Sequence, residues 1–141
     1  MDSDASPFID PDPGHVFYQD DLVIGLWDQD PVSPGHALVV TRRVVPDWFA
    51  ATDEEQAALL RAITHARDEI LQQHRPDGFN IGINSGAAAG QTIFHLHVHV
   101  IPRYQGDVED PGGGVRHVLP SKGNYRAADS SESISVEDIG M

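Results

Sequence analysis

The sequence contains no cysteine, so the fold does not depend on disulfide bonds. It also lacks any apolar run that approaches the roughly 18 residues of a membrane-spanning helix. No basic segment followed by an apolar one marks a secretory signal peptide. These absences lead us to expect a cytoplasmic protein with no membrane partner.

Basic residues are also scarce. The 141 residues include 9 Lys and Arg against 22 Asp and Glu, which gives a formal net charge of −13. Eight of the acids lie in the first thirty residues, where there is no Lys or Arg. Such a chain repels polyanions, so nucleic acid is not expected as a partner. Any phosphate group must be bound by local donors that act against this overall field.

The length fits one domain with a single core. An acidic segment with several prolines predicts a flexible N-terminal arm over positions 1–12, and the patterned segments of the domain fill positions 13–126. Positions 127–141 contain four acids, four serines and no basic residue. This composition predicts a disordered acidic tail.

The spacing of apolar residues predicts an α+β fold, with an antiparallel sheet of about five strands, one long helix and one short helix. Thr52 and Glu55 form the pattern of a capping box, which begins the long helix. Apolar residues at helical spacing should face the sheet: Leu59, Ile63, Ala66 and Ile70. The strands are expected at 15–18, 22–27, 37–41, 79–84 and 93–101, the short helical turn at 46–49, and the end of the long helix at 75–78.

The most informative segment is a row of three histidines, His95, His97 and His99, which alternate with aliphatic residues. Alternation predicts a β-strand, in which every second side chain points to the same face. Each imidazole carries two ring nitrogens that need partners, so a row of three does not suit a dry core. The row therefore predicts a functional site.

Two chemistries fit this row. Metal binding is one, but same-face residues on a strand lie roughly 6.6 Å apart, so three parallel imidazoles converge poorly on one ion. The segment 81–102 also contains no Asp or Glu. The other is nucleophilic catalysis by an imidazole, with neighbouring rings that bind an anion. The small and polar residues at 84–92 suit a phosphate pocket and favour this second chemistry.

Two segments resemble the histidine-triad (HIT) family of nucleotide hydrolases and transferases. The first, 90–103, contains the row of histidines, with Gly90-Gln91-Thr92 before it and Pro102-Arg103 after it. The second, 28–40, contains Asp28 and then Pro34-Gly35-His36, followed by an aliphatic strand. The resemblance covers roughly positions 8–103 in the right order. It implies a HIT-like α+β fold and, because the family typically forms dimers whose sheets join, a homodimer.

The resemblance also implies roles for the histidines. His97, in the middle, is the expected nucleophile. In the family this residue attacks the α-phosphate and forms a covalent nucleotidyl-imidazole, while a backbone carbonyl near the first histidine accepts a hydrogen bond from its other ring nitrogen. His99 is expected to bind the oxygens of the transferred phosphate, and His95 and His36 to support the arrangement. No cofactor is expected.

Other residues are expected to bind the substrate. By resemblance, Asp28 matches the position that binds the ribose hydroxyls. Leu26, Phe17 and Phe8 are candidates for the walls of a base pocket, although core residues would give the same pattern. The amide and hydroxyl groups of the loop before the histidines could stabilise a transition state or satisfy backbone groups of that loop: Asn84, Gln91 and Thr92.

The N-terminus differs from part of the family. Some members have a zinc site that begins with Cys-x-x-Cys, where this chain has Ser6-Pro7-Phe8-Ile9, so no metal is expected. Segments 103–107 and 112–116 are similar to the fragile-histidine-triad branch, whose members split dinucleoside polyphosphates such as diadenosine tri- and tetraphosphate. The resemblance therefore implies a hydrolase of that substrate class. A nucleoside phosphoramidate hydrolase, a non-catalytic nucleotide-binding sensor and a metal-dependent hydrolase remain as alternatives.

Overall fold

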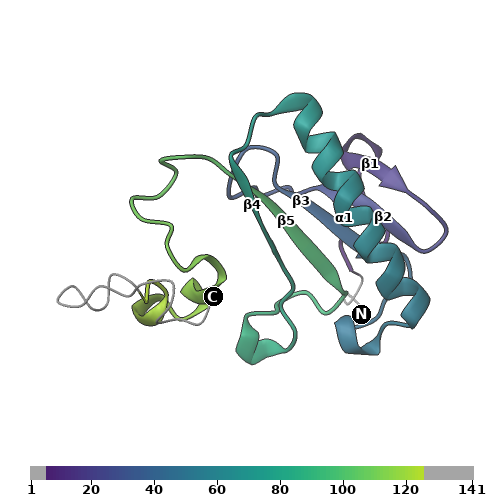
Figure 1. Cartoon of the computed structure of the whole chain (residues 1–141). Coiled ribbons are helices and arrows are strands. Elements are labelled where there is room, and N and C mark those ends of the chain that lie inside the picture. The colour runs from purple at the N-terminus through teal and green to yellow at the C-terminus, as the bar shows by residue number, and fades with distance from the viewer. Residues whose placement is uncertain (1–5, 126–141) are drawn as a thin grey trace. The chain divides into compact units, whose positions relative to one another are not determined.

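A computed structural model describes residues 6–125. The chain divides into two compact units, with the boundary after Tyr104. All strands and the long helix lie in the first unit (Figure 1). Among the described residues, no helix is both long and apolar enough to cross a membrane. The predicted tail and the first five residues of the predicted arm lie outside the described residues.

The first unit is built on a five-stranded sheet in the order β1-β2-β3-β5-β4, in which every neighbouring pair is antiparallel. One long helix, α1, accompanies it, and a short 3-10 helix, η2, occupies the predicted helical turn. The predicted α+β class is therefore confirmed. The bounds are β1 Val16–Gln19, β2 Val23–Trp27, β3 Ala37–Thr41, β4 Gly78–Gly82, β5 His97–Arg103, η2 Trp48–Ala50 and α1 Asp53–Gln73.

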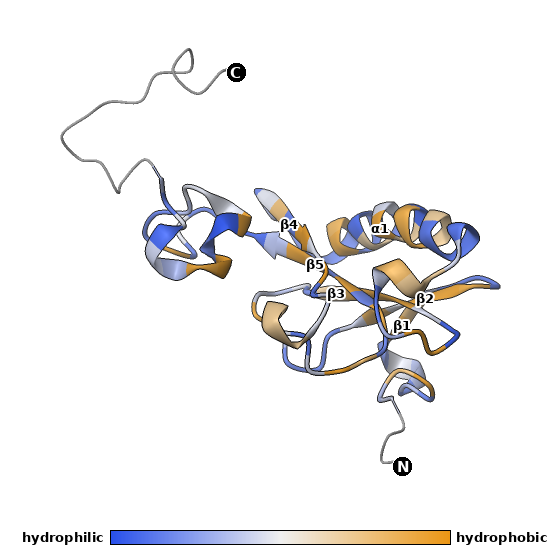
Figure 2. Ribbon diagram, turned by 90° about the horizontal axis from the view of Figure 1, so that it is seen from below, coloured by the Kyte–Doolittle hydropathy of each residue, from blue (hydrophilic) through white to orange (hydrophobic). Residues whose placement is uncertain are grey.

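Helix α1 begins at the predicted capping box. The Thr52 hydroxyl accepts the backbone N–H of Glu55 at 3.0 Å, and the Glu55 carboxylate accepts the N–H of Thr52 at 2.9 Å. The helix lies along one face of the sheet (Figures 1 and 2). There its apolar stripe packs on buried side chains of β2, β3 and β5, as the helical spacing predicts. The buried helix residues are Glu55, Ala58, Leu59, Ala62, Ala66 and Ile70, with Ile63 partly buried.

A second, smaller apolar cluster consists of alternate residues of β2 and β3. It contains Ile24, Leu26, Leu38 and Val40, with Phe8 packed against it. Side chains alternate between the faces along a strand, so this cluster lies on the face opposite to α1. The same alternation in β5 directs Val98 and Val100 into the helix-side core and leaves the intervening histidines half-buried. The sheet therefore has one face for packing and one that also carries imidazoles.

The structure corrects two predicted strands. β5 begins at His97 rather than at Ile93, because the chain before it bonds outside the sheet: the N–H of Leu96 donates to the carbonyl of Val45, and the Gln91 amide donates to the carbonyl of Ile93. β4 spans Gly78–Gly82 instead of 79–84. Periodicity alone cannot show where a ladder of hydrogen bonds begins, so the apolar alternation overestimates the strand at 93–101.

The second unit, described through Tyr125, contains two short 3-10 helices, η4 (Gly114–Val118) and η5 (Pro120–Lys122). The Arg116 guanidinium joins its segments by donating to the carbonyls of Gly123 and Lys122, at 3.1 and 3.3 Å. Gly113 has a φ of 94°, and a Cβ there would lie 2.1 Å from the Gly123 carbonyl oxygen. This contact explains why a glycine is needed at that position.

Candidate active site

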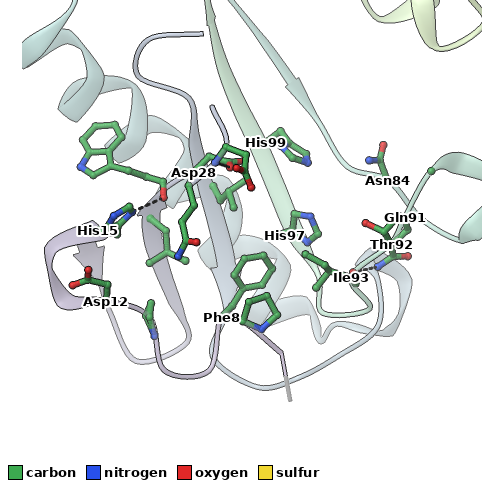
Figure 3. Close-up of a pocket in the computed structure, with 18 residues that line it drawn as sticks. Phe8, Asp12, His15, Asp28, Asn84, Gln91, Thr92, Ile93, His97 and His99 are labelled. Carbon is green, nitrogen blue, oxygen red and sulfur yellow. Dashed lines mark hydrogen bonds between the residues drawn. The ribbon is translucent and has the colours of Figure 1, made fainter. Parts of the chain in front are cut away.

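A pocket of about 290 Å³ lies on the sheet face opposite to α1 (Figure 3). Segments far apart in the sequence form it: residues 7–15, the end of β2 with the residues after it, the loop 84–93, and β5. His97 and His99 line the pocket from β5, and Asp28 lines it from the end of β2. The structure therefore brings most of the predicted site residues to one cavity.

The ring orientation of His97 is set by one short hydrogen bond. Its Nδ1 lies 2.7 Å from the carbonyl oxygen of His95. A carbonyl only accepts, so Nδ1 carries a proton. In the neutral ring the lone pair is then on Nε2. The Phe8 ring packs beside the imidazole, with 5.0 Å between the ring centroids. His97 thus has the tautomer that a nucleophilic Nε2 requires.

His95 does not line the pocket and is fully buried. Its Nε2 donates to the carbonyl of Thr41 at 2.6 Å, and its Nδ1 accepts from the hydroxyl of Ser6 at 2.6 Å. Burial lowers the pKa of His95, and the neighbouring His97 lowers it further against the raising effect of the Thr41 carbonyl. The expectation that these rings do not suit a dry core is wrong for His95, because both of its ring nitrogens have partners.

His36 and His99 form a relay of hydrogen bonds. The backbone N–H of Val32 donates to Nδ1 of His36 at 3.1 Å, so the proton of the neutral His36 ring is on Nε2. That Nε2 donates a hydrogen bond to Nδ1 of His99 at 3.0 Å and lies 3.4 Å from an Asp28 carboxylate oxygen. The proton of His99 is consequently on Nε2. His99 lines the pocket and supplies an N–H donor suited to a phosphate oxygen.

Burial keeps these two rings uncharged. It lowers the pKa of His99 to about 4, and the neighbouring His97 and His36 add to this effect. Burial also lowers the pKa of His36, against the opposing effect of the Asp28 carboxylate. Both rings are therefore neutral at physiological pH, which preserves the direction of the relay.

The ligand atoms of Asp28, His36 and His99 lie within 4.8 Å of one another, as in a metal site. The hydrogen bond to His36 does not fit such an ion. A metal-binding imidazole normally donates its other N–H to an acceptor, whereas Nδ1 of His36 faces the N–H donor of Val32. An ion on Nε2 would require this ring to lose its only proton. These hydrogen bonds therefore fit a pair of neutral imidazoles better than a metal site.

The three predicted loop residues, Asn84, Gln91 and Thr92, differ in whether their polar atoms are available to a ligand. Asn84 and Thr92 line the pocket with exposed side chains. Gln91 also lines it but is buried, and its amide donates to the carbonyls of Pro46 and Ile93 while accepting the N–H of Gly86. Gln91 thus holds the loop in shape, and its polar atoms are already occupied.

The three predicted base-wall residues do not all reach the pocket, because Phe8 and Leu26 line it and Phe17 does not. Leu26 lines the pocket. Phe17 lies outside it and packs in the helix-side core, with its ring centroid 4.6 Å from that of Trp27. Its neighbour Val16 packs in the pocket-side cluster, whereas an irregularity of β1 between Val16 and Tyr18 places both Phe17 and Tyr18 against the helix-side core. The assignment of Phe17 to the pocket is therefore corrected.

The N-terminal segment contributes residues that the sequence reasoning did not assign to the site. Ser6 bonds to His95, and Asp12 and His15 line the pocket, although positions 1–12 were predicted to form an arm and no role was predicted for His15. No local pattern could have revealed the contact between Ser6 and His95, because it joins residues 89 positions apart. The sequence Pro11-Asp12-Pro13-Gly14 before His15 does indicate an ordered turn in this segment.

Comparison with known proteins agrees with this geometry. Residues 11–106 match the HIT domain family. AP-4-A phosphorylase from Mycobacterium tuberculosis is 39% identical over 111 residues, which cover 74% of this chain and 57% of that protein. Bis(5'-nucleosyl)-tetraphosphatase [asymmetrical] from Schizosaccharomyces pombe is 36% identical over 95 residues, which cover 67% of this chain and 52% of that protein. The chain thus spans little more than half the length of these two enzymes.

A solved structure agrees as well. A hypothetical histidine triad nucleotide-binding protein from Sulfolobus tokodaii matches with a TM-score of 0.62 and 34% identity, over 68% of this chain and 64% of that one. The family match covers most of the first unit, including the segments that form the pocket from Pro11 onward. On these grounds the chain belongs to the HIT domain family.

Proposed function

We propose that this protein is a nucleotide hydrolase that attacks the α-phosphate of dinucleoside polyphosphates, such as diadenosine tri- and tetraphosphate. The observation that carries this proposal is the hydrogen bond of 2.7 Å from Nδ1 of His97 to the carbonyl of His95. It leaves Nε2 as the nucleophilic atom of a ring that lines a pocket. The names of two relatives, AP-4-A phosphorylase and bis(5'-nucleosyl)-tetraphosphatase, support this substrate class.

The reaction has two displacements. In the first, the lone pair of His97 Nε2 forms a bond to the α-phosphorus, and the bond from phosphorus to the bridging oxygen breaks. The bridging electron pair leaves with the nucleoside polyphosphate. The ring then carries a positive charge, which the His95 carbonyl dipole stabilises through the Nδ1 proton. In the second displacement, water attacks phosphorus, the N–P bond breaks, and the nucleoside monophosphate and a proton are released.

Neutral donors assist this chemistry. His99 presents Nε2–H to the phosphoryl oxygens, and the relay from His36 prevents the opposite tautomer. Asn84 and Thr92 offer an amide and a hydroxyl at the same cavity. Within residues 6–125, no Lys or Arg lines this pocket. The phosphate is therefore oriented by hydrogen bonds, and Asp28 accepts hydrogen bonds from the ribose hydroxyl groups.

Hydrolysis in ¹⁸O-labelled water tests the site of attack. With diadenosine tetraphosphate, the label should enter the nucleoside monophosphate, and rapid quench followed by intact-mass measurement should show an adenylyl adduct. His97→Ala should lose the adduct and at least about 10⁴-fold of the turnover, because the nucleophile is missing. Turnover retained in His97→Ala, or label in the triphosphate product, would contradict the proposal.

His65→Ala is the matched control. His65 is exposed on α1, where its ring stacks on Tyr18, so its loss removes an imidazole without reaching the pocket. We expect this variant to keep the adduct and the turnover of the original protein. Far-UV circular dichroism of both variants separates loss of chemistry from loss of fold.

We also propose that the protein is a homodimer, as its family resemblance implies. β4 lies at the edge of the sheet and exposes 47% of Ile81. An edge with exposed backbone groups and apolar side chains can pair with a second chain. Light scattering coupled to size-exclusion chromatography should give twice the monomer mass, and Ile81→Lys should shift it to the monomer. A monomeric mass for the original protein would contradict this.

A further inference from the structure

We infer that Asp12 and His15 recognise the exocyclic amino group of the nucleobase, so that the pocket prefers adenine to hypoxanthine. This inference rests on the proposed function, since it assumes that a nucleotide occupies the pocket. It concerns the part of the cavity away from the reacting phosphate. Neither residue takes part in the chemistry described above.

The two ends of the pocket have different side chains. Asn84 and Thr92 lie at one end, and Asp12 and His15 lie at the other, with His97 and Phe8 between them (Figure 3). A nucleotide whose α-phosphate meets His97 and whose polyphosphate extends toward Asn84 must direct its base toward Asp12 and His15. Asp28, the proposed ribose ligand, lies between the two regions in the same view.

The walls of this end suit an aromatic base. Leu26 and Leu38 come from the sheet, and Pro7, Phe8 and Pro11 come from the N-terminal segment. Apolar walls favour the faces of a purine through burial and stacking but do not distinguish one purine from another. Selectivity must therefore come from polar atoms at the edge of the base.

His15 supplies the first of these atoms. Its Nδ1 lies 3.4 Å from the carbonyl oxygen of Trp27, which only accepts, so Nδ1 carries the proton. In the neutral ring Nε2 is then a hydrogen-bond acceptor. Within the described part of the chain, Nε2 of His15 has no hydrogen-bond partner, and the half-buried ring lines the pocket.

Asp12 supplies the second. One carboxylate oxygen accepts the backbone N–H of Gly14 at 2.9 Å, which fixes the side chain at the start of a short turn. The other oxygen has no hydrogen-bond partner among residues 6–125. Asp12 also lines the pocket. The base edge is thus met by two acceptors whose positions are set by bonds to the backbone.

Two acceptors select a group that donates two hydrogens. The 6-amino group of adenine does so, whereas hypoxanthine has a carbonyl oxygen at that position and would bring a third acceptor against them. A polar site rejects an analogue that leaves its groups unpaired, because their desolvation is not compensated. Since Asp12 is exposed, we expect discrimination of about ten- to a hundredfold, below that of a fully buried site.

Binding of AMP and IMP, measured by isothermal titration calorimetry, tests the inference without requiring turnover. The original protein should bind AMP about ten- to a hundredfold more tightly than IMP. Asp12→Asn keeps an oxygen for the Gly14 N–H but replaces the free acceptor with an N–H₂ donor. It should therefore reduce the AMP to IMP ratio about tenfold or reverse it.

Asp68→Asn is the matched control, because it removes the same charge from an exposed site on α1. It should leave the AMP to IMP ratio unchanged. Equal affinities for AMP and IMP in the original protein, or equal ratios in the Asp12 and Asp68 variants, would overturn the inference. If adenine selectivity is found without hydrolysis of diadenosine tetraphosphate, the proposed function fails while the base contact stands.

Discussion

The two faces of the sheet are made from the same strands but do different work. The face toward α1 is closed by aliphatic side chains, which form the larger core. The opposite face has a smaller apolar cluster and, beside it, the histidine rings. Each ring nitrogen there either has a hydrogen-bond partner or faces the pocket. β5 joins the two, with Val98 and Val100 on one side and His97 and His99 on the other.

Along β5, a step of one residue therefore separates side chains of the core from side chains of the candidate site. A change on the helix side should affect unfolding and leave the direction of the ring hydrogen bonds intact. A change on the pocket side should alter proton positions at small cost to the core. Variants on each face test whether the two are separate in function.

The largest expected effect on stability is on the helix side. Leu59→Ala removes a fully buried side chain from α1 and should lower the free energy of unfolding by about 2–5 kcal/mol. Urea denaturation measures this change. At temperatures where the variant is folded, its KM and kcat should match those of the original protein. A large fall in kcat with unchanged stability would show that the two faces are not separate in function.

A second effect on stability is expected from pH. Burial lowers the pKa of His36, His95 and His99 from the ordinary value of 6.5, so the unfolded chain binds more protons than the folded one just below that pH. Stability is thus fully present above pH 6.5 and declines as the pH falls toward 4, the folded value for His99. The slope should reach at most about 1.4 kcal/mol per pH unit for each ring.

Urea denaturation between pH 7 and 5 measures this slope. The lowered carboxyl pKa values of Asp20 and Glu55 act below their ordinary values of 3.8 and 4.5, so they do not contribute in this range. His99→Leu should flatten the slope by removing one of the three rings. A stability that does not change between pH 7 and 5 would contradict the neutral, buried state of these rings.

The smallest effect is expected at Ser6. Its hydroxyl donates to Nδ1 of His95 and accepts the N–H of Phe8. It therefore links the N-terminal segment to His95, the residue whose backbone carbonyl orients the His97 ring. Ser6→Ala should lower stability by about 1 kcal/mol and reduce kcat more than it changes KM. Ser6→Thr retains the hydroxyl and should restore kcat. Equal kcat in all three proteins would limit Ser6 to a structural role.

The sequence predicted the parts of the fold that depend on local patterns. The capping box at Thr52 and the strand at 37–41 were found because their signals lie within a few residues. Motif resemblance placed His97, His99 and Asp28, which line one pocket. It could not show that Gln91 is occupied by backbone groups, because that depends on carbonyls at Pro46 and Ile93.

Other features of the site required three-dimensional contacts. Phe17 and Leu26 are both apolar strand residues, and only the pairing of β1 with β2 and its irregularity at Val16–Tyr18 decide which face each side chain meets. The partners of His95 come from Ser6 and Thr41, both far from it in sequence. A periodic pattern gives the face of a residue but not its hydrogen-bond partner.

The late start of β5 has a consequence for the orientation of His97. Had the ladder of the sheet continued back to Ile93, the backbone oxygen of His95 would have been available for pairing with a neighbouring strand. Because the regular strand begins only at His97, the backbone oxygen of His95 does not take part in the sheet and accepts a hydrogen bond from the His97 ring. The His97 ring is thus oriented by a backbone oxygen that lies just before the regular strand.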